Sequence, residues 1–475
     1  MADETVPAPE KAPWADLWRD GRGVYSALVI GGVVLHALQI LVINIVMPTV
    51  VADVGGAAYY TWPAMIYTIG TIVGSACVGP VWAALGRRYG TVASALAFGV
   101  GTIGCALAPD MAMLIAARAV QGFSGGLIVG GGMALVSAFY TDSQRRRVLA
   151  AHQGTWMFAQ LCGPLVGGAF AEIGWWRGSF WTLVPIVAIF AVLAWTRIPD
   201  EAPTETETRS RSFPVLRIML LASGVLAVAL SGPVDSVWLR GLLIVGALAL
   251  VALTFRVDDR SAVRMYPSRA LSLSSPVGLA LMILFTGGMA QTSINLFVPL
   301  LLQVVHGVTP LFISFVSIVI SGGWTLGTFV VSGWSGKRER IALVSGPVLM
   351  LGGLAVMAAT AKLPLLPVIT IAAFFFGLGV GIHNVHLIAR TMAHAAKGEE
   401  RITSSAIPSI RSLGTAFGAA MAGGLSTAAG LGNATDPVAV GRAVTWVYAA
   451  NLLPLAISVA LMILLVRLDR QPIKR

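Results

Sequence analysis

Charged residues are scarce in this chain: Asp, Glu, Lys and Arg make up 11% of its 475 residues, whereas 56% are hydrophobic. A soluble domain usually carries about 25% charged residues, which solvate its surface. The mean hydropathy of +0.82 points in the same direction. This composition excludes an ordinary soluble domain and indicates a protein whose outer surface faces lipid.

Cysteine is rare as well. The three cysteines, Cys77, Cys105 and Cys162, are isolated in apolar stretches, which argues against a disulfide framework or a metal site. Gly-rich runs near 122–132 and 377–381 follow no predicted strand and precede no Lys-Ser/Thr pair, so they indicate close helix packing rather than a phosphate loop. No acidic cluster suits a membrane enzyme. We therefore expect no cofactor, no metal and no enzymatic activity.

The sequence contains fourteen apolar runs. Their lengths are close to the roughly 20 residues that an α-helix needs to span a bilayer. They predict an all-α polytopic membrane protein with fourteen transmembrane helices. The runs lie at 24–51, 61–82, 91–108, 111–138, 148–171, 177–197, 214–234, 236–256, 276–304, 311–334, 341–360, 364–388, 403–430 and 443–467.

The net charge of +11 is distributed unevenly, because most of the 32 Lys and Arg fall in every second loop. This is the positive-inside pattern, which predicts that both termini are cytoplasmic and accounts for the basic charge without nucleic acid. No cleavable signal precedes the first run, and we expect a multi-pass protein of the bacterial inner membrane. The basic loops lie at 11–22, 87–88, 145–147, 197–217, 256–269, 337–340, 390–401 and 467–475; the opposite loops hold Arg177, Arg240, Lys362 and Arg442.

Two polar linkers divide the chain into six runs, then two, then six. The linkers at 198–213 and 257–275 contain charged residues and turn formers, as flexible connections do. The expected order is a cytoplasmic tail (1–23), a six-helix bundle (24–197), a linker (198–213), two inserted helices (214–256), a linker (257–275), a second six-helix bundle (276–467) and a cytoplasmic tail (468–475).

The two six-helix blocks repeat weakly. Asn44 precedes Pro48 by four residues in the first run of one block, as Asn295 precedes Pro299 in the other, and each Asn has a Gln upstream, Gln39 or Gln291. Both second runs lead into short basic loops, and both fifth runs are rich in glycine. Repeated halves of this kind build transporters that rock about a substrate site at the midplane.

At these positions the chain resembles the fourteen-helix drug:proton antiporter branch of the major facilitator superfamily. Residues 38–48 are similar to the family's first-helix pattern, and the loop from Gly79 to Gly90 resembles the motif between helices two and three. Arg118 to Gly122 and Arg411 to Gly414 match patterns of the fourth and thirteenth helices. The resemblance implies a membrane transporter with gating residues at Gly79, Gly86, Arg87, Arg88, Gly163, Pro164, Gly167 and Gly168.

The chain departs from the family pattern where the pattern has acids. The first-helix Asp of the family is Gln39 here, and the loop-motif Asp falls at Ala83. Ala150 and Ala159 stand for upstream glycines of the fifth-helix motif. The first departure removes the carboxylate that implies proton coupling, and the second removes part of the charge pairing of the cytoplasmic gate.

Arg118 is the most informative candidate residue. An Arg at bilayer depth costs roughly 2.5–3.5 kcal/mol on insertion scales, so it should face the bundle interior and have a partner. One interpretation is a structural anchor bonded to carbonyls, Gln39 or Asn44; the other is a sensor that exchanges partners with substrate or proton state. Arg411 lies nearer the cytoplasmic side and can also snorkel.

Histidines are the remaining candidates for proton exchange, because their unperturbed pKa is near 6.5. His36 shares a helix face with Gln39. His383 and His386 flank Asn384, where a cavity-lining or packing role is expected rather than a metal site. The substrate and coupling candidates are His36, Gln39, Asn44, Arg118, Gln121, Trp156, Gln291, Asn295, His383, Asn384 and Arg411.

The sequence thus predicts a secondary transporter that exports an amphipathic neutral or anionic organic compound by alternating access. Buried cations without buried anions favour such substrates. Proton coupling is implied by the resemblance; a proton-independent facilitator, or a lipid-handling or scaffold membrane protein, is the alternative. The expected partners are a small amphipathic substrate, protons and the bilayer, and the protein is expected to be a monomer.

Overall fold

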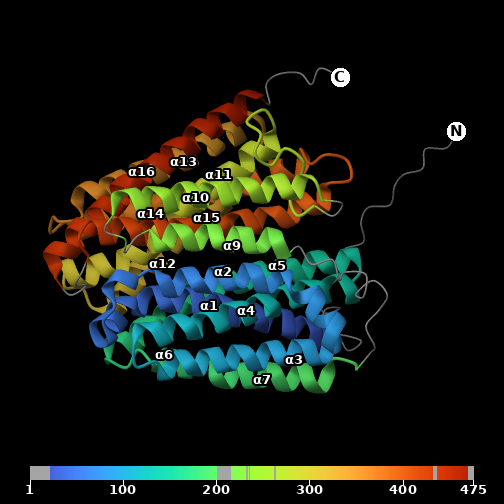
Figure 1. Cartoon of the computed structure of the whole chain (residues 1–475). Helices are drawn as coiled ribbons and strands as arrows, with labels where there is room; N and C mark the ends of the chain where they lie inside the picture. Colours follow the sequence, from blue (N-terminus) through green and yellow to red (C-terminus); the bar gives the residue numbers. More distant parts are fainter. Residues whose placement is uncertain are drawn as a thin grey trace.

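The computed structural model describes residues 22–200, 215–231, 234, 236–261, 264–431 and 436–468, and the regular structure of these residues is helical. The first six runs form one bundle, lower in Figure 1. Its elements are α1 (Arg22–Val54), the short η2 (Ala57–Tyr59), α2 (Trp62–Ala76), α3 (Val78–Leu107), α4 (Met111–Phe139), α5 (Asp142–Glu172), α6 (Gly178–Trp181) and α7 (Val184–Arg197).

The last six runs form the second bundle, above the first in Figure 1. Its elements are α11 (Pro276–Leu300) with the π-helical turn η3 (Leu301–Val305), α12 (Pro310–Val331), α13 (Gly336–Thr360), α14 (Leu366–Ala393), α15 (Glu400–Ala428) and α16 (Pro437–Leu468). Two further helices lie between the bundles in sequence, α9 (Val215–Leu230) and α10 (Val237–Asp259). All fourteen predicted runs therefore fall on helices.

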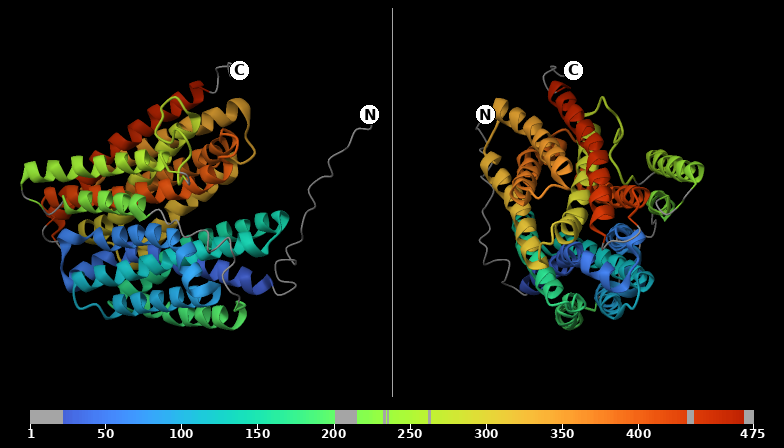
Figure 2. Two further views of the ribbon diagram at one scale, coloured as in Figure 1. Left: turned by 45° about the vertical axis from the view of Figure 1, so that its right-hand side comes forward. Right: turned by 90° about the vertical axis from the view of Figure 1, so that its left-hand side faces the viewer.

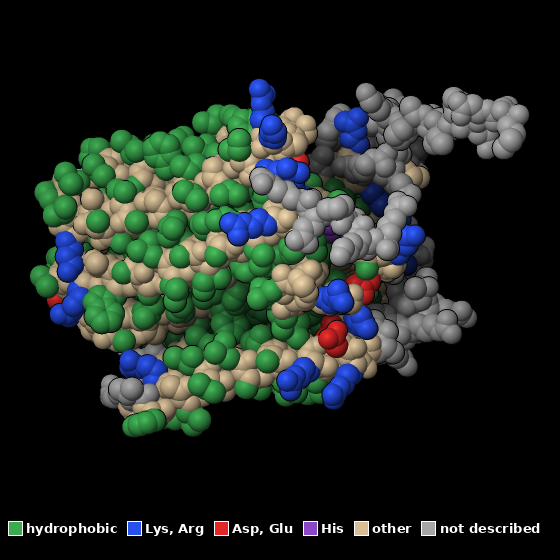
Figure 3. Space-filling model, turned by 90° about the horizontal axis from the view of Figure 1, so that it is seen from above, with side chains coloured by type: hydrophobic (Ala, Val, Ile, Leu, Met, Phe, Trp, Pro, Cys, Tyr) green, Lys and Arg blue, Asp and Glu red, His purple; other side chains and the backbone are tan. Residues whose placement is uncertain are grey.

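By length and composition alone, ten membrane spans can be assigned in the described part of the chain, with α6 and α7 counted as one span. The other four runs fall on α2 and α9, which are short, and on α5 and α15, which carry more polar residues. Hydrophobic side chains dominate the face seen in Figure 3, with Lys and Arg mainly toward its ends. Trp238 of α10 is 90% exposed, as expected of a side chain that faces lipid.

Local sequence sets several helix ends. Asp110 caps α4 by accepting a hydrogen bond from the Met113 backbone N at 2.8 Å. Thr141 and Gln144 form a capping box at the start of α5. Gly86 breaks α3 with φ of 78° and ψ of 164°, a backbone conformation that favours glycine. The break falls within the predicted loop between the second and third runs.

Hydrogen bonds join the two bundles at one end of the molecule. This end holds the C-terminal end of α1 and lies opposite the end where α1 begins and α16 ends. Tyr60 donates to the carbonyl of Leu296 at 2.9 Å, and the Gln303 amide donates to Thr49 at 3.2 Å. On the other side of the interface, the Glu172 carboxylate accepts from the Leu311 backbone N at 3.0 Å. In Figure 2 the bundles lie against each other along α1, α2 and α5 on one side and α11, α12 and α15 on the other.

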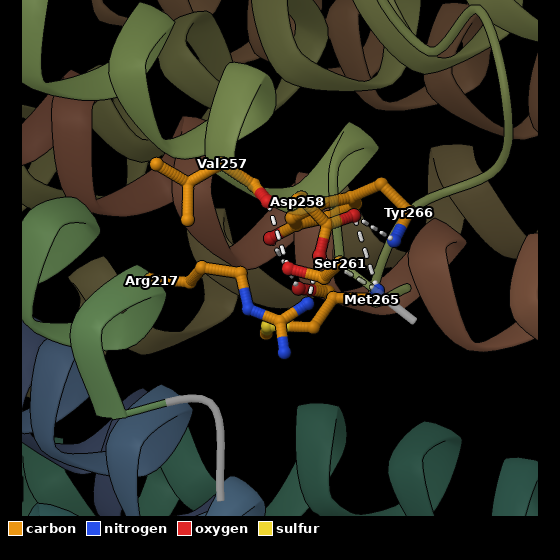
Figure 4. Close-up of polar contacts among 7 residues, drawn as sticks. Arg217, Val257, Asp258, Ser261, Met265 and Tyr266 are labelled. Carbon is orange, nitrogen blue, oxygen red and sulfur yellow. Dashed lines mark hydrogen bonds and ion pairs between the residues drawn. The ribbon is translucent and has the colours of Figure 1, made fainter. Parts of the chain in front are cut away.

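The inserted helices form a hairpin beside the bundles. α9 packs against α10, α15 and α2, so it contacts both bundles. α10 lies on the outer side of α9, away from the bundles (Figure 2). Residues 257–259 of the predicted linker continue α10, which ends at Asp259, and Asp258 is buried. Its carboxylate pairs with Arg217 of α9 and accepts from the backbone N of Met265 and of Tyr266, both at 2.9 Å (Figure 4).

This ionic cluster also connects the hairpin to the second bundle. The hydroxyl of Tyr266 lies 3.2 Å from that of Ser409 on α15. A few residues further on, Ser268 donates to the Glu399 carboxylate through its backbone N at 2.9 Å and its hydroxyl at 2.8 Å. The connection after α10 is therefore held against the start of α15.

We expect Asp258→Asn to destabilise the protein, because it removes the negative charge that is paired with the buried Arg217 guanidinium, a change that typically costs roughly 3–5 kcal/mol. Thermal unfolding of the detergent-solubilised protein measures the effect. Asp259→Asn is the matched control, because Asp259 is exposed and the same charge is removed one residue away. Equal melting temperatures for the two variants would contradict a stabilising role for the cluster.

Candidate functional site

A small cavity lies between the two bundles. Its wall combines polar and apolar side chains from α1, α2 and α4 on one side and α11 and α15 on the other. Asn44 and Asn295, the matching asparagines of the two halves, both line it. The repeat seen in the sequence thus places equivalent amides on opposite sides of one cavity. The lining residues are Ile40, Ile43, Asn44, Ala64, Thr68, Arg118, Thr292, Asn295, Leu296, Thr415 and Ala419.

Arg118 lies in the wall of this cavity and is completely buried. Its Nε donates to the carbonyl of Pro63 at 3.1 Å, and its Nη1 donates to Oε1 of Gln39 at 3.1 Å and to Oε1 of Gln121 at 2.6 Å. The guanidinium also lies over the ring of Tyr67, 4.1 Å from its centroid. The expected bonds to a carbonyl and to Gln39 are present; Asn44, the other expected partner, does not bond to Arg118 but lines the cavity beside it.

Among the residues that the structure describes, Arg118 has no carboxylate partner. Its contacts in the described residues are a carbonyl, two neutral amides and an aromatic face, so no opposite charge compensates its own. A buried charge without a counter-ion is costly, and neutral hydrogen bonds offset this cost only in part. One nitrogen of the guanidinium, Nη2, is buried without a partner, and so is Nε2 of Gln39.

His36 belongs to the same cluster through Tyr67. Its Nδ1 lies 2.9 Å from the Tyr67 hydroxyl, and its ring meets that of Trp156 edge-on, with centroids 5.9 Å apart. Tyr67 thus contacts His36 through its hydroxyl and Arg118 through its ring face. Of the predicted residues, the first bundle therefore brings together His36, Gln39, Arg118, Gln121 and Trp156.

The second bundle holds a separate polar pair. Arg411 of α15 donates from Nη2 to Oδ1 of Asn384 on α14. The neighbouring histidines bond to two different backbone carbonyls, His383 to Gly379 at 2.7 Å and His386 to Val331 at 3.0 Å, so they do not converge on a shared ligand. Gln291 is partly buried on α11 and does not line the cavity.

The glycines of α5 pack against two neighbours. A Cβ on Gly163 would lie 2.7 Å from Cβ of Leu41 in α1, and Gly167 faces α1 in the same way. On the other side, a Cβ on Gly168 would lie 2.1 Å from the Ser314 hydroxyl in α12, and that hydroxyl donates to the Pro164 carbonyl at 2.6 Å. This segment of α5 therefore joins the cavity wall of one bundle to the other bundle.

The matching family model decides the assignment: the Major Facilitator Superfamily model matches residues 29–419. The chain belongs to the major facilitator superfamily. It is 29% identical over 433 residues to a "probable multidrug-efflux transporter" of Mycobacterium tuberculosis, covering 88% of this chain and 90% of that one. It is 25% identical over 441 residues to the multidrug transporter protein MdtP of Bacillus subtilis, covering 86% and 77% respectively.

Solved structures of this superfamily share the fold. A bacterial homologue of the human lysosomal transporter Spinster, in an inward-facing and unoccupied conformation, superposes with a TM-score of 0.62 at 15% identity and covers 96% of this chain and 99% of that one. The human organic anion transporter MFSD10 gives a TM-score of 0.54 at 14% identity, with 92% and 99% covered. The protein is thus a multi-pass membrane transporter and not an enzyme.

The superfamily loop motif is anchored here by aromatic rings. Following Gly79 and the break at Gly86, the Arg87 guanidinium lies over the ring of Phe139 at 5.3 Å and that of Arg88 lies over Trp195 at 4.5 Å. Ala83 offers these arginines no carboxylate. In the second half, Arg390 near the end of α14 donates to Glu339 near the start of α13 at 2.6 Å.

Three site residues escaped the sequence analysis. Tyr67 and Pro63 were missed because a tyrosine and a carbonyl in an apolar run give no signal of their own. Thr102 of α3 accepts from Nε2 of Gln121 at 2.9 Å and thereby fixes the amide that bonds to Arg118. Helical periodicity shows which residues share a face of α2 or of α4. To place an aromatic hydroxyl near Arg118, the rotation of both helices about their axes must also be known.

We expect Gly168→Ala to weaken the α5–α12 contact, because its Cβ would overlap the Ser314 hydroxyl and approach the carbonyl of Pro310 at 2.8 Å. Transport should slow, and the melting temperature should fall by a few degrees. Gly154→Ala in the same helix is the control, since nothing lies within 4 Å of its added Cβ. Matching behaviour of the two variants would show that the close contact is unimportant.

Proposed function

We propose that this protein is a secondary active transporter that exports an amphipathic neutral or anionic organic compound by alternating access. The observation that carries the proposal is the fully buried Arg118, which lies in the wall of the inter-bundle cavity and has no carboxylate partner in the described part of the chain. Cationic substrates are disfavoured there, because a second positive charge at low dielectric repels the first. An anionic group is stabilised by it.

The rest of the cavity suits an amphipathic molecule. Ile40, Ile43 and Leu296 provide apolar surface, and Thr68 and Thr292 donate their hydroxyl hydrogens to their own helices at 2.9 Å. Apolar lining with a few placed polar groups is typical of small-molecule sites. The export direction is supported by the efflux names of the relatives.

Two energy sources have specific support. His36 is the candidate for proton coupling, because it bonds to Tyr67, the residue over whose ring Arg118 lies. A proton on His36 would add a second positive charge close to Arg118, with His152 of α5 also nearby, and would change the hydrogen bond of His36 to Tyr67. The partners of Arg118 would then respond to protonation without an acid at position 39.

A proton-independent facilitator is the second candidate. Gln39 occupies the position of the family's acid and accepts a hydrogen bond from Arg118, so this contact involves no titrating carboxylate. For an anion no proton switch is required, because a membrane potential that is negative inside drives anions outward with about 2.3 kcal/mol per charge per 100 mV. The loss of the acid and the choice of an anionic substrate are therefore physically consistent.

Transport into inverted vesicles tests the proposal. We expect uptake of lipophilic anions or neutral amphiphiles in preference to lipophilic cations, measured separately under an imposed pH gradient and under a potassium-diffusion potential. Arg118→Ala should abolish transport, because the charge and the hydrogen-bonded cluster are lost together. Fully pH-dependent uptake of a dication would overturn the proposal that the substrate is neutral or anionic. If the Arg118→Ala variant still performs the protein's role in the cell, a scaffold protein would be favoured.

His36→Gln separates the two energy sources. We expect this variant to lose the component of transport driven by the pH gradient, because glutamine can bond to Tyr67 but cannot take a proton at neutral pH. The potential-driven component should remain. His394→Gln is the control, since His394 is exposed at the end of α14. A pH-driven component that persists in His36→Gln would exclude His36 as the proton carrier.

A further inference from the structure

The two unpartnered atoms of the Arg118 cluster are both hydrogen-bond donors. Nη2 of Arg118 and Nε2 of Gln39 are buried and without partners. Buried polar groups are usually paired, and an unpaired donor costs its full desolvation penalty. A ligand that offers acceptor oxygens would relieve both atoms, whereas a ligand that offers only donors would relieve neither.

The direction of the Gln39 amide follows from chemistry. A guanidinium only donates, so the atom of Gln39 that faces Nη1 of Arg118 at 3.1 Å must be the oxygen. Its NH2 group is therefore turned away from Arg118. The Gln121 amide likewise turns its oxygen toward Arg118, but its NH2 group donates a hydrogen bond to the Thr102 hydroxyl at 2.9 Å. Of these two glutamines, Gln39 is the one whose NH2 group has no partner among the described residues.

The missing partner should also be negatively charged. The cluster has one cation and no carboxylate, so a neutral carbonyl ligand would satisfy the donors but not the charge. A carboxylate supplies two acceptor oxygens and one negative charge, and its planar geometry matches guanidinium and amide groups. Asn44 and Asn295 line the cavity in whose wall Arg118 lies, and their side chains make no hydrogen bond among the described residues, so they add one amide donor from each bundle. Gln39 is not in the cavity lining and lies behind Arg118, to which it is hydrogen-bonded.

We propose that Arg118, Gln39, Asn44 and Asn295 form the recognition site for the carboxylate of an amphipathic organic monocarboxylate, whose hydrocarbon part lies against Ile40, Ile43 and Leu296. This inference narrows the proposed function and rests on it. The carboxylate brings Arg118 the negative charge that the family's first-helix acid would supply, while Gln39 keeps its own hydrogen bond to the guanidinium. Because Asn44 and Asn295 belong to different bundles, the bound carboxylate bridges the two moving parts.

The test compares a matched acid and amide, 1-naphthaleneacetate and 1-naphthaleneacetamide, by calorimetric titration of the purified protein in nanodiscs at neutral pH. We expect the acid to bind at least tenfold more tightly than the amide. In Gln39→Glu the new carboxylate pairs with Arg118, so the preference for the acid should disappear while the ligand-free protein melts at a higher temperature. The amide should bind with similar affinity to both forms.

Gln303→Glu is the matched control, because it adds the same charge on η3, where Gln303 contacts Thr49 rather than Arg118. It should keep the preference for the acid. Arg118→Gln, which removes the charge but keeps a donor, should lose it. The proposal is overturned by equal binding of acid and amide, by failure of the acid to bind, or by a preference that survives in Gln39→Glu.

Vesicle transport of the same two compounds separates this inference from the proposed function. Transport of both without discrimination would retain the transporter and reject the carboxylate site. Selective binding of the acid without transport of either compound would retain the site and reject the proposed export of such amphiphiles.

Discussion

A buried arginine without a counter-ion sets the arrangement of the first bundle. Arg118 of α4 is held by a carbonyl of α2, an amide of α1 and an amide of its own helix that is fixed in turn by α3. Four helices thus contribute to one guanidinium, with Tyr67 beneath it. Since lipid offers no water to solvate this charge, the helices must keep these positions whenever the site is empty.

The same helices transmit the position of Arg118 to the second bundle. α1 carries both Gln39 and Leu41, and Leu41 faces α5. The Leu41 side chain lies so close to Gly163 that a residue with a Cβ would not fit there. One residue after Gly163, the Pro164 carbonyl accepts a hydrogen bond from Ser314 of α12. If the partners of Arg118 change, α1 can shift. Because the backbones of α1 and α5 are closely packed, such a shift is resisted or transmitted to α12 and is not absorbed by flexible side chains.

Hydropathy was sufficient to predict the helices, because the bilayer fixes their length and composition. The repeat predicted that Asn44 and Asn295 occupy equivalent places, and the charge of Arg118 predicted a partner such as Gln39. Sequence did not reveal Tyr67 or the burial of Asp258, because both depend on how helices are rotated and on partners distant in the chain. Asp258 follows an apolar run beside a second Asp and a basic linker, which is also the pattern of a solvated helix end; only Arg217, 41 residues earlier, makes it a buried ion pair.

The inserted hairpin adds a constraint on any rocking motion of the bundles. Its connection to the second bundle is bound through Tyr266 to Ser409 and through Ser268 to Glu399, both near the start of α15. Against the first bundle, α9 packs on α2 without a hydrogen bond among the residues that the structure describes. Hydrogen bonds resist sliding more than apolar contacts between helices do, because sliding separates a specific donor from its acceptor, whereas apolar side chains can exchange neighbours. The hairpin should therefore travel with α15, and the α2–α9 surface is where the two moving parts slip past each other.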